Sequence, residues 1–169
     1  MDLVVREARD TELDRIGALT AEVYEGEDLA GPEYLTVLRD ARSRWESPAT
    51  TLLVAFDDGA EEDADLLGTV VYAAPGSPWQ DLATGDEVEF RMLATAAPAR
   101  GRGVGESLVR ACIERAKLAG APRLVLSTGP QHLAAHRLYE RLGFTRVPER
   151  DWRPHQGTDF VLRAYVLEL

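Results

Sequence analysis

The sequence predicts an α+β fold in which a mixed central sheet of roughly six to seven strands is flanked by about four helices. Two observations carry this prediction. Three consecutive strand candidates are separated by turn signals and no helix, which indicates antiparallel pairing, and the second half alternates strand and helix, which indicates a crossover. The full order is β-α-α-β-β-β-α-β-α-β(-β). Because no repeat or linker divides the 169 residues, we expect a single domain over 1–169.

The first third of the chain predicts one strand and two helices. Residues 3–8 form a short strand candidate, and Asp10 or Thr11 is placed to cap the helix that follows. That helix has one apolar face, formed by Leu13, Ile16, Leu19 and Val23. Pro32 opens a second helix, which is expected to continue until Pro48.

The middle of the chain predicts three strands in succession, at 51–56, 66–73 and 87–95. Between the first two, the segment from Asp57 to Asp65 holds six acidic residues and one glycine. Their spacing lacks the fixed ligand pattern of a calcium loop. We therefore expect a solvated hairpin loop there and no metal site.

The C-terminal part predicts a helix at 103–118, a buried strand at 123–127, a helix at 133–142 and a weakly alternating strand at 160–169. The first of these helices has the strongest periodicity in the chain. Gly120 and Gly143 stand just beyond the two helices, where a glycine is the usual C-terminal stop.

Composition and charge exclude several classes of protein. The net charge of −10 argues against nucleic-acid binding, because neutralising phosphates needs an excess of Lys and Arg. No window approaches about 18 apolar residues and no basic segment precedes an apolar run, so we expect no membrane span and no signal peptide. Cys112, the only cysteine, is expected to be buried, in a reducing cytoplasm. The histidines and the cysteine show no metal-ligand spacing, so no metal is expected.

The hexapeptide Arg100-Gly101-Arg102-Gly103-Val104-Gly105 opens the strongest helix, and a glycine-rich turn at a helix N-terminus is typical of an anion site. A P-loop would require Lys-Ser or Lys-Thr after the glycines, which this segment lacks. A dinucleotide-binding fingerprint would require G-x-G-x-x-G fed directly by a strand, whereas the glycines here run G-x-G-x-G. A tight turn with solvent-facing arginines is the structural alternative.

A third anion-binding pattern, R/Q-x-x-G-x-G/A, fits the segment, because Arg100, Gly103 and Gly105 fill its defining positions. In such a loop consecutive backbone N–H groups point into one concavity at the helix N-terminus, where the helix dipole also favours negative charge. Glycine is needed because a Cβ would hold a pyrophosphate away from the amides. Arg100 and Arg102 can add charge-assisted hydrogen bonds.

Two motifs resemble the GCN5-related N-acetyltransferase (GNAT) superfamily of acyl-CoA-dependent acyltransferases. "MLATAAPARGRGVG" resembles the strand, loop and helix that hold the donor in this family, with Thr95 where a Val is usual and Pro98 one residue late. "HLAAHRLYERLGF" resembles N-x-x-A-x-x-L-Y-x-x-x-G-F, with His132 at the Asn position. The resemblance implies acetyl-CoA as co-substrate and these donor-binding residues: Met92, Leu93, Ala94, Thr95, Arg100, Gly101, Arg102, Gly103, Val104, Gly105, Glu106, His132, Ala135 and Tyr139.

The resemblance also implies how the leaving group and the carbonyl are handled. Tyr139 stands at the position of the tyrosine that donates a proton to the departing CoA thiolate, which a phenol can do. The alternative is a purely structural core aromatic. The family's splayed strand pattern implies a backbone N–H near Leu93 as the donor that polarises the thioester carbonyl.

The general base has several candidates. Glu89 lies eleven positions before Arg100, which resembles the placement of the base in histone-acetylating relatives. Strand alternation predicts one shared face for Glu87, Glu89, Arg91 and Leu93. Glu87 is therefore a second candidate, acting directly or through a water. Two alternatives stay open: one glutamate pairs with Arg91 as a structural contact, or the base belongs to the loop at 149–155.

The acceptor side is predicted from aromatic residues in the segments that form it in this family, namely Tyr24, Tyr34, Trp79 and Trp152. The two tryptophans either stack on a substrate or cap the edge of the core. His136 lies off the apolar stripe of its helix and is expected to be exposed.

These implications together predict a cytoplasmic acetyl-CoA-dependent N-acetyltransferase that acts on a primary amine of a small molecule or peptide. Direct attack in a ternary complex is favoured, because no catalytic Cys or Ser-His arrangement supports an acyl-enzyme. Two alternatives stay open: another short-chain acyl-CoA donor, or an acyl-CoA-binding sensor without catalysis. The resemblance allows a homodimer and names no acceptor.

Overall fold

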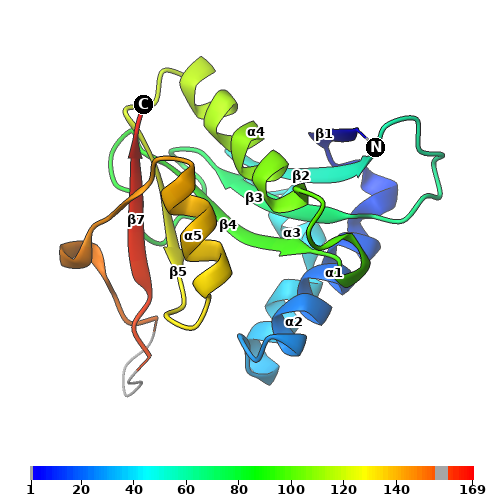
Figure 1. Cartoon of the computed structure of the whole chain (residues 1–169), viewed down its shortest axis with the longest axis horizontal. Helices are drawn as coiled ribbons and strands as arrows, with labels where there is room; N and C mark the ends of the chain where they lie inside the picture. The colour runs from blue at the N-terminus through cyan, green and yellow to red at the C-terminus, as the bar shows by residue number, and fades with distance from the viewer. Residues whose placement is uncertain (1, 155–159) are drawn as a thin grey trace.

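The computed structural model describes residues 2–154 and 160–169, and over these residues seven strands form one mixed sheet (Figure 1). The strands are β1 (Leu3–Glu7), β2 (Thr50–Asp57), β3 (Gly68–Ala73), β4 (Val88–Thr95), β5 (Arg123–Thr128), β6 (Thr145–Arg146) and β7 (Arg163–Glu168). They lie in the order β1-β2-β3-β4-β5-β7-β6, with β4 and β5 parallel and the other neighbours antiparallel. The predicted α+β class is confirmed. Two predicted strands are shorter than expected, since β3 begins at Gly68 and β7 at Arg163.

The described residues contain the α-helices α1 (Leu13–Gly26), α2 (Pro32–Arg39), α3 (Ala41–Trp45), α4 (Val104–Leu118) and α5 (Leu133–Arg141). The sequence predicts one helix from Pro32 to Pro48, but Asp40 leaves the helical conformation with ψ of 71° and divides it in two. The Asp40 carboxylate then accepts a hydrogen bond from the N–H of Ser43 at 3.2 Å, which begins α3. Both glycine stops are confirmed, since Gly120 and Gly143 have φ of 73° and 98°.

The start of α1 differs from its predicted cap. A 3-10 turn, η1 (Asp10–Glu12), precedes the helix, and within the described residues the side chains of Asp10 and Thr11 accept no capping hydrogen bond. Glu12 takes over this role, because its carboxylate accepts from the N–H of Arg9 at 2.7 Å and from the guanidinium of Arg6 at 2.6 and 2.9 Å. The contact with Arg6 of β1 therefore determines that Glu12, and not Asp10, stabilises the turn.

Helices cover both faces of the sheet. One face packs against α4 and α5, with the fully buried Leu108, Leu124 and Leu126 at its centre (Figure 1). The other packs against α1, α2 and α3 around Ile16 and Leu38. Cys112 lies in the first core with no exposed surface, as predicted, and burial raises the pKa of its thiol to about 12.

The acidic segment forms the predicted loop between β2 and β3, which are antiparallel neighbours. Its residues from 58 to 63 are exposed, so the charges stay in water. Among the described residues no helix has the length and apolar character needed to cross a membrane.

A bulge in β4 changes which side chains share a face. The β3–β4 register shifts between Thr69 and Val71, so that Met92 and Leu93 together lie opposite one residue of β3. Met92 has a φ of 56°, in the left-handed region. It packs into the core under α1–α3, whereas Leu93 packs against the core under α4 and α5. The predicted alternation, which places Leu93 on the face of Glu89, is therefore wrong beyond Arg91.

The pairing of β4 with β5 positions the site. The two strands pair at Val88–Leu124 and Glu89–Val125, and this pairing does not continue through the rest of the described strands. Beyond Glu89 the strands diverge, as the green and yellow strands of Figure 1 show. The backbone edge of β4 from Phe90 onward thus faces a gap in the sheet instead of a neighbouring strand.

Candidate active site

A cleft with a volume of about 1110 Å³ opens where β4 and β5 separate. It is lined by the end of β4, the loop at 99–103, the start of α4, the β5–α5 turn, α5 and the connection between α1 and α2. Pockets for small ligands measure about 300–1,000 Å³, so the cleft can hold a large ligand together with a second, smaller one. We take it as the candidate active site.

The predicted glycine-rich loop lies on one wall of this cleft. Gly101 and Gly103 both have φ of 80°, a conformation that side-chain-bearing residues rarely adopt, and Gly103 is the residue that precedes α4. A Cβ at either glycine would meet no protein atom within 4 Å. The sequence therefore places glycine where the backbone turns left-handed and where a side chain would extend into open space.

Almost all of the predicted donor-binding residues line the cleft; the two exceptions are Ala94 and Arg102. Ala94 is buried in the sheet with 1% exposure. Arg102 forms an ion pair with Asp57 at the end of β2, which turns its side chain away from the cleft. Arg100 does line the cleft, where it pairs with Glu27 at 3.3 Å. The prediction that both arginines face the bound anion is thus corrected for Arg102.

Tyr139 reaches the cleft from α5 with only 5% of its surface exposed. Its ring packs against Phe90, Phe144 and Tyr165, with centroid distances of 5.8, 5.9 and 5.9 Å. Burial raises the pKa of the phenol, and no other described residue hydrogen-bonds its hydroxyl. The hydroxyl is therefore protonated and available to a ligand, while the ring is fixed by its neighbours.

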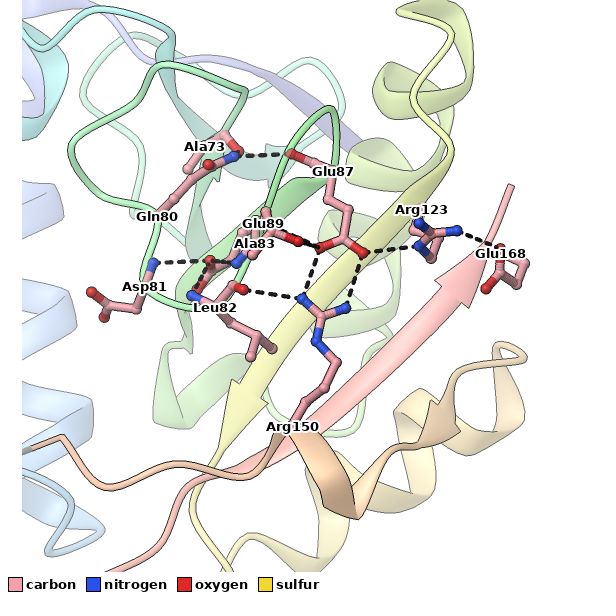
Figure 2. A network of polar contacts seen from close by, with 11 residues as sticks. Ala73, Gln80, Asp81, Leu82, Ala83, Glu87, Glu89, Arg123, Arg150 and Glu168 are labelled. Atoms are coloured by element: carbon pink, nitrogen blue, oxygen red, sulfur yellow. Dashed lines mark hydrogen bonds and ion pairs between the residues drawn. The ribbon is translucent and has the colours of Figure 1, made fainter.

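Neither glutamate predicted as general base lines the cleft, as far as the described residues show. Glu89 has no exposed surface, and its Oε1 accepts three backbone N–H groups, from Asp81, Leu82 and Ala83, at 3.0, 2.8 and 2.9 Å (Figure 2). Burial raises the pKa of Glu89 and outweighs these hydrogen bonds. The structure brings Glu89 to the loop between β3 and β4 instead of to the cleft.

Glu87 is 3% exposed, and its carboxylate accepts hydrogen bonds from two arginines (Figure 2). Arg150 contacts both of its carboxylate oxygens, at 2.8 and 2.9 Å, and Nε of Arg123 lies 2.9 Å from Oε2. Burial alone would raise its pKa, but the hydrogen bonds from Arg150, the N–H of Thr84 and Arg123 lower it to about 2. Such a carboxylate is a poor proton acceptor, so the geometry gives Glu87 a structural role.

This low pKa predicts how Glu87 contributes to stability at different pH values. A carboxyl whose pKa falls from 4.5 to about 2 on folding adds about 3 kcal/mol of stability at neutral pH. The contribution is present above pH 4.5 and is lost as pH falls toward 2. Urea unfolding of wild type and Glu87→Gln should therefore differ most at pH 7 and converge toward pH 2. A difference that does not change with pH would contradict the assignment.

The loop at 149–155, the other predicted source of a base, supplies Trp152 and Pro154 to the cleft. Asp151 is engaged elsewhere, because both of its oxygens lie 2.7 Å from the guanidinium of Arg146. His155 lies outside the described residues. The described part of this loop thus gives an aromatic wall and no carboxylate to the cleft.

Of the aromatic residues predicted for an acceptor, Tyr24, Tyr34 and Trp152 line the cleft and Trp79 does not. Tyr24 and Tyr34 meet edge to face at a centroid distance of 6.4 Å. Nε1 of Trp152 donates to Oγ of Ser127 at 2.8 Å, which fixes the indole beside the end of β5. Trp79 instead packs on the core under α1–α3. The prediction is therefore corrected for this residue, which caps the edge of the core.

The sequence and this geometry agree with one family. The Acetyltransferase (GNAT) family matches residues 2–144, which is most of the chain. The chain belongs to the GNAT family.

Solved GNAT structures share the fold of this chain. An acetyltransferase of the GNAT family from Staphylococcus aureus superposes with a TM-score of 0.75 at 13% identity, covering 99% of each chain. The structure of yncA from Salmonella typhimurium with its cofactor acetyl-CoA superposes with a TM-score of 0.66 at 18% identity, covering 99% of this chain and 94% of that one. At these identities the likeness shows the fold alone.

A curated relative is closer in sequence over a shorter segment. The N-acetylaspartate synthetase of Danio rerio is 42% identical over 88 residues, which are 52% of this GNAT chain and 30% of the relative. The matched segment therefore spans less than a third of that protein. The relative supports the acetyltransferase family and leaves the acceptor of this chain open.

The two histidines of the α5 segment differ in position. His132, at the usual Asn position of the GNAT motif, lines the cleft, and burial lowers the pKa of its imidazole. His136 was expected to be exposed, but it is 6% exposed and its Nε2 lies 2.9 Å from the carbonyl oxygen of Gly129. That expectation is wrong because β7 covers this side of α5, where the ring of Tyr165 lies 5.7 Å from that of His136.

Four charged residues of this GNAT cleft were not predicted as site residues from the sequence, namely Glu27, Asp81, Arg91 and Arg141. Arg91 appeared only as a partner for a neighbouring glutamate, and Asp81 lies in a loop whose position the local sequence does not determine. Among the described residues no group of three or more His, Cys, Asp and Glu side chains is arranged to hold a metal ion.

Proposed function

We propose that the chain, as one domain over 1–169, is an N-acetyltransferase that moves the acetyl group of acetyl-CoA to a primary amine of a small molecule or peptide. The observation that carries this proposal is the cleft itself, which brings the glycine loop at the start of α4 and the buried Tyr139 hydroxyl to the same cavity. Direct attack of the amine is favoured, because the one cysteine is fully buried with a raised thiol pKa and does not line the cleft formed by the described residues.

The glycine loop would hold the pyrophosphate of the donor. The N–H groups at the N-terminus of the 15-residue helix α4 have no acceptor within the helix, and the helix dipole adds positive potential there. Arg100 would add a charge-assisted hydrogen bond once the pyrophosphate displaces Glu27 from it. The divergence of β4 from β5 leaves room for the pantetheine arm between the strands.

Acetyl-CoA supplies the acyl group as a thioester. The unpaired edge of β4 beyond Glu89 offers backbone N–H groups to the thioester carbonyl, and the one near Leu93 is the proposed donor. A single oriented donor of this kind is worth about 3 kcal/mol in other acyl-transfer enzymes. Tyr139 would then hold its proton until a thiolate forms in the same buried cleft, where desolvation raises the proton affinity of the sulfur as well.

The Danio rerio relative, by its name, makes N-acetylaspartate, which supports a small amine acceptor over a large protein substrate. The acceptor wall of aromatic residues, with Tyr24, Tyr34 and Trp152, is compatible with a small molecule held between rings.

Two measurements test the proposed function together. Calorimetry gives the affinity for acetyl-CoA, and a free-thiol dye gives the rate of CoA release with a panel of amines and peptides. We expect binding and amine-dependent thiol release. Binding without turnover on any acceptor would favour a sensor, and failure to bind acetyl-CoA would overturn the whole proposal.

Gly103 offers a test of the donor site, because the pattern R/Q-x-x-G-x-G/A admits only glycine at its position. A Cβ at Gly103 would meet no protein atom within 4 Å, although its φ of 80° disfavours a side chain. A side chain in this conformation costs about 1–2 kcal/mol, so Tm should fall slightly. The methyl group of Gly103→Ala would keep the pyrophosphate from the amides, and we expect acetyl-CoA affinity to drop at least about 10-fold.

Gly59→Ala is the matched control, because Gly59 has a similar φ of 76°, a Cβ there also meets no protein atom within 4 Å, and Gly59 does not line the cleft formed by the described residues. Equal acetyl-CoA affinities for the two variants would contradict the donor site. A much larger loss of Tm for Gly103→Ala than for Gly59→Ala would instead mean that the glycine serves the start of α4.

A further inference from the structure

An ion pair lies inside the cleft on the acceptor side. The guanidinium of Arg91, on β4, lies 3.0 Å from a carboxylate oxygen of Asp81, in the loop between β3 and β4. Both side chains keep some surface open, at 18% for Arg91 and 36% for Asp81, and both line the cleft. Neither residue has a part in the proposed handling of the donor.

Arg91 is held by two residues of the loop between β3 and β4 and by one residue of α2. Nη1 donates to the carbonyl oxygen of Trp79 at 3.0 Å, Nη2 donates to the hydroxyl of Tyr34 at 3.2 Å, and Nη2 also forms the ion pair with Asp81. The two hydrogen bonds use two of the five N–H donors of a guanidinium. A ligand in the cleft would therefore meet a cation that the protein holds in place and that has donors to spare.

Asp81 is fixed by its backbone. Its N–H donates to Oε1 of the buried Glu89 at 3.0 Å, and the next two N–H groups bind the same oxygen (Figure 2). On one side of it, Nε2 of Gln80 donates to the carbonyl oxygens of Ala73 and Glu87, each at 3.0 Å. On the other, Arg150 donates to the carbonyl oxygen of Leu82 at 3.0 Å. The loop is therefore anchored, and the Asp81 carboxylate has a defined place in the cleft.

We propose that Arg91 and Asp81 form the acceptor subsite and that its ligand is an α-amino acid, with the carboxylate of the ligand on Arg91 and its amino group on Asp81. This inference rests on the proposed function and adds the substrate class. An amino acid carries opposite charges on neighbouring atoms, and so does the pair, so the two dipoles can lie antiparallel with each charge beside its opposite. Charge-assisted hydrogen bonds of this kind are about twice as strong as neutral ones.

The same pair disfavours other amines. A simple alkylamine or a polyamine would have to share the Asp81 carboxylate with the Arg91 cation, close to that positive charge, and would bring no carboxylate for the other N–H donors of Arg91. A dicarboxylate without an amine would meet the reverse problem at Asp81. Tyr24 and Tyr34, beside the pair, leave space for a side chain against their rings.

The first experiment uses the wild-type chain and three forms of each acceptor. Each amino acid of a panel is compared with its carboxamide and with the amine that lacks the carboxyl group, and thiol release gives kcat/KM. For the preferred amino acid we expect kcat/KM to exceed that of both analogues by about 10- to 100-fold, because the carboxamide offers Arg91 only a neutral acceptor and the amine without the carboxyl group offers none. Equal rates for the three forms would overturn the inference.

Variants locate the effect. Arg91→Gln should raise KM for the amino acid about 10-fold or more and leave KM for its carboxamide unchanged, and Asp81→Asn should weaken both. Asp86→Asn, an exposed acid of the same loop that does not line the cleft in the described structure, is the matched control and should change neither. Acetyl-CoA affinity by calorimetry should be the same in all four proteins.

The outcomes separate this inference from the proposed function. If plain amines and amino acids are turned over alike, and Arg91→Gln has the KM of wild type for the amino acid, the subsite proposal is overturned and the proposed acetyltransferase function stands. If no acceptor releases thiol, calorimetry of the amino-acid panel with CoA-loaded protein still tests the subsite. Binding that Arg91→Gln weakens would then support the subsite, and failure to bind would overturn it.

Discussion

Tyr139→Phe is expected to lower kcat by about 100-fold or more while leaving the affinity for acetyl-CoA unchanged, since positioned acids contribute about 10²–10⁴-fold. The substitution removes only the hydroxyl, and the ring contacts with Phe90, Phe144 and Tyr165 that fix the side chain remain. Burial raises the pKa of this phenol, so the proton is present at neutral and mildly alkaline pH. Thiol release gives kcat and calorimetry gives the Kd of acetyl-CoA.

Tyr165→Phe is the matched control for this prediction. Tyr165 belongs to the same aromatic cluster and is 1% exposed, but its hydroxyl donates to Glu140 at 3.3 Å. It does not line the cleft formed by the described residues. A kcat that Tyr139→Phe leaves unchanged would show that Tyr139 is a core aromatic only. An equal loss in both variants would point to a disturbed core.

The glycine loop and the Tyr139 motif could be predicted as parts of one cleft because their signals are local. The glycines at 101, 103 and 105 mark one turn and one helix start, and Gly101 and Gly103 stand where φ is 80°. The motif around Tyr139 occupies a single helix and its glycine stop. Short segments of this kind carry their own conformational requirements, so most of the predicted residues line the cleft even though the sequence alone could not say what faces them.

Arg102 and His136 show where this local logic ends. Arg102 has the charge and the position in the loop that an anion contact requires, but Asp57, 45 residues earlier, takes it instead. His136 lies off the apolar stripe of α5 and is covered by β7, which follows much later in the chain. In both cases a segment distant in sequence determines where the side chain lies. The residue pattern around Arg102 or His136 does not indicate that segment.

The surroundings of Glu87, Glu89 and Arg91 depend even more on tertiary contacts. Strand alternation correctly grouped Glu87, Glu89 and Arg91 but could not say what covers their face. The answer is the loop at 79–84 together with Arg150, which is 63 residues away from Glu87. The bulge at Met92 then moves Leu93 to the opposite face. The sequence pattern therefore predicts a general base at Glu87 or Glu89, whereas in the fold both carboxylates hold neighbouring segments in place.

Glu89 gives the sharpest test of this distinction between base and anchor. Glu89→Leu removes the acceptor of three backbone N–H groups in a fully buried place, and each unsatisfied group costs about 1–3 kcal/mol, so we expect a loss of at least about 3 kcal/mol in unfolding free energy. Loss of the anchored loop should also raise KM for the acceptor. Glu89→Gln keeps a carbonyl oxygen for the three amides and should retain kcat/KM within a few-fold.

The pH dependence of the unfolding free energy distinguishes Glu89 as a structural anchor from Glu89 as the general base. Because burial raises the folded pKa of Glu89 above 4.5, the wild-type carboxyl stabilises the fold below pH 4.5 and loses that contribution as pH rises through the raised pKa. Glu89→Gln stays neutral, but its NH2 would replace Oε2, which has no hydrogen-bond partner among the described residues, and would add a cost that does not depend on pH. By urea unfolding, the stability of Glu89→Gln relative to wild type should therefore be highest at pH 7 and fall toward pH 4. If Glu89 were the base, Glu89→Gln would instead abolish turnover at unchanged stability. Loss of turnover at unchanged stability would show that the Glu89 carboxylate is the general base and that a catalytic residue also anchors the loop.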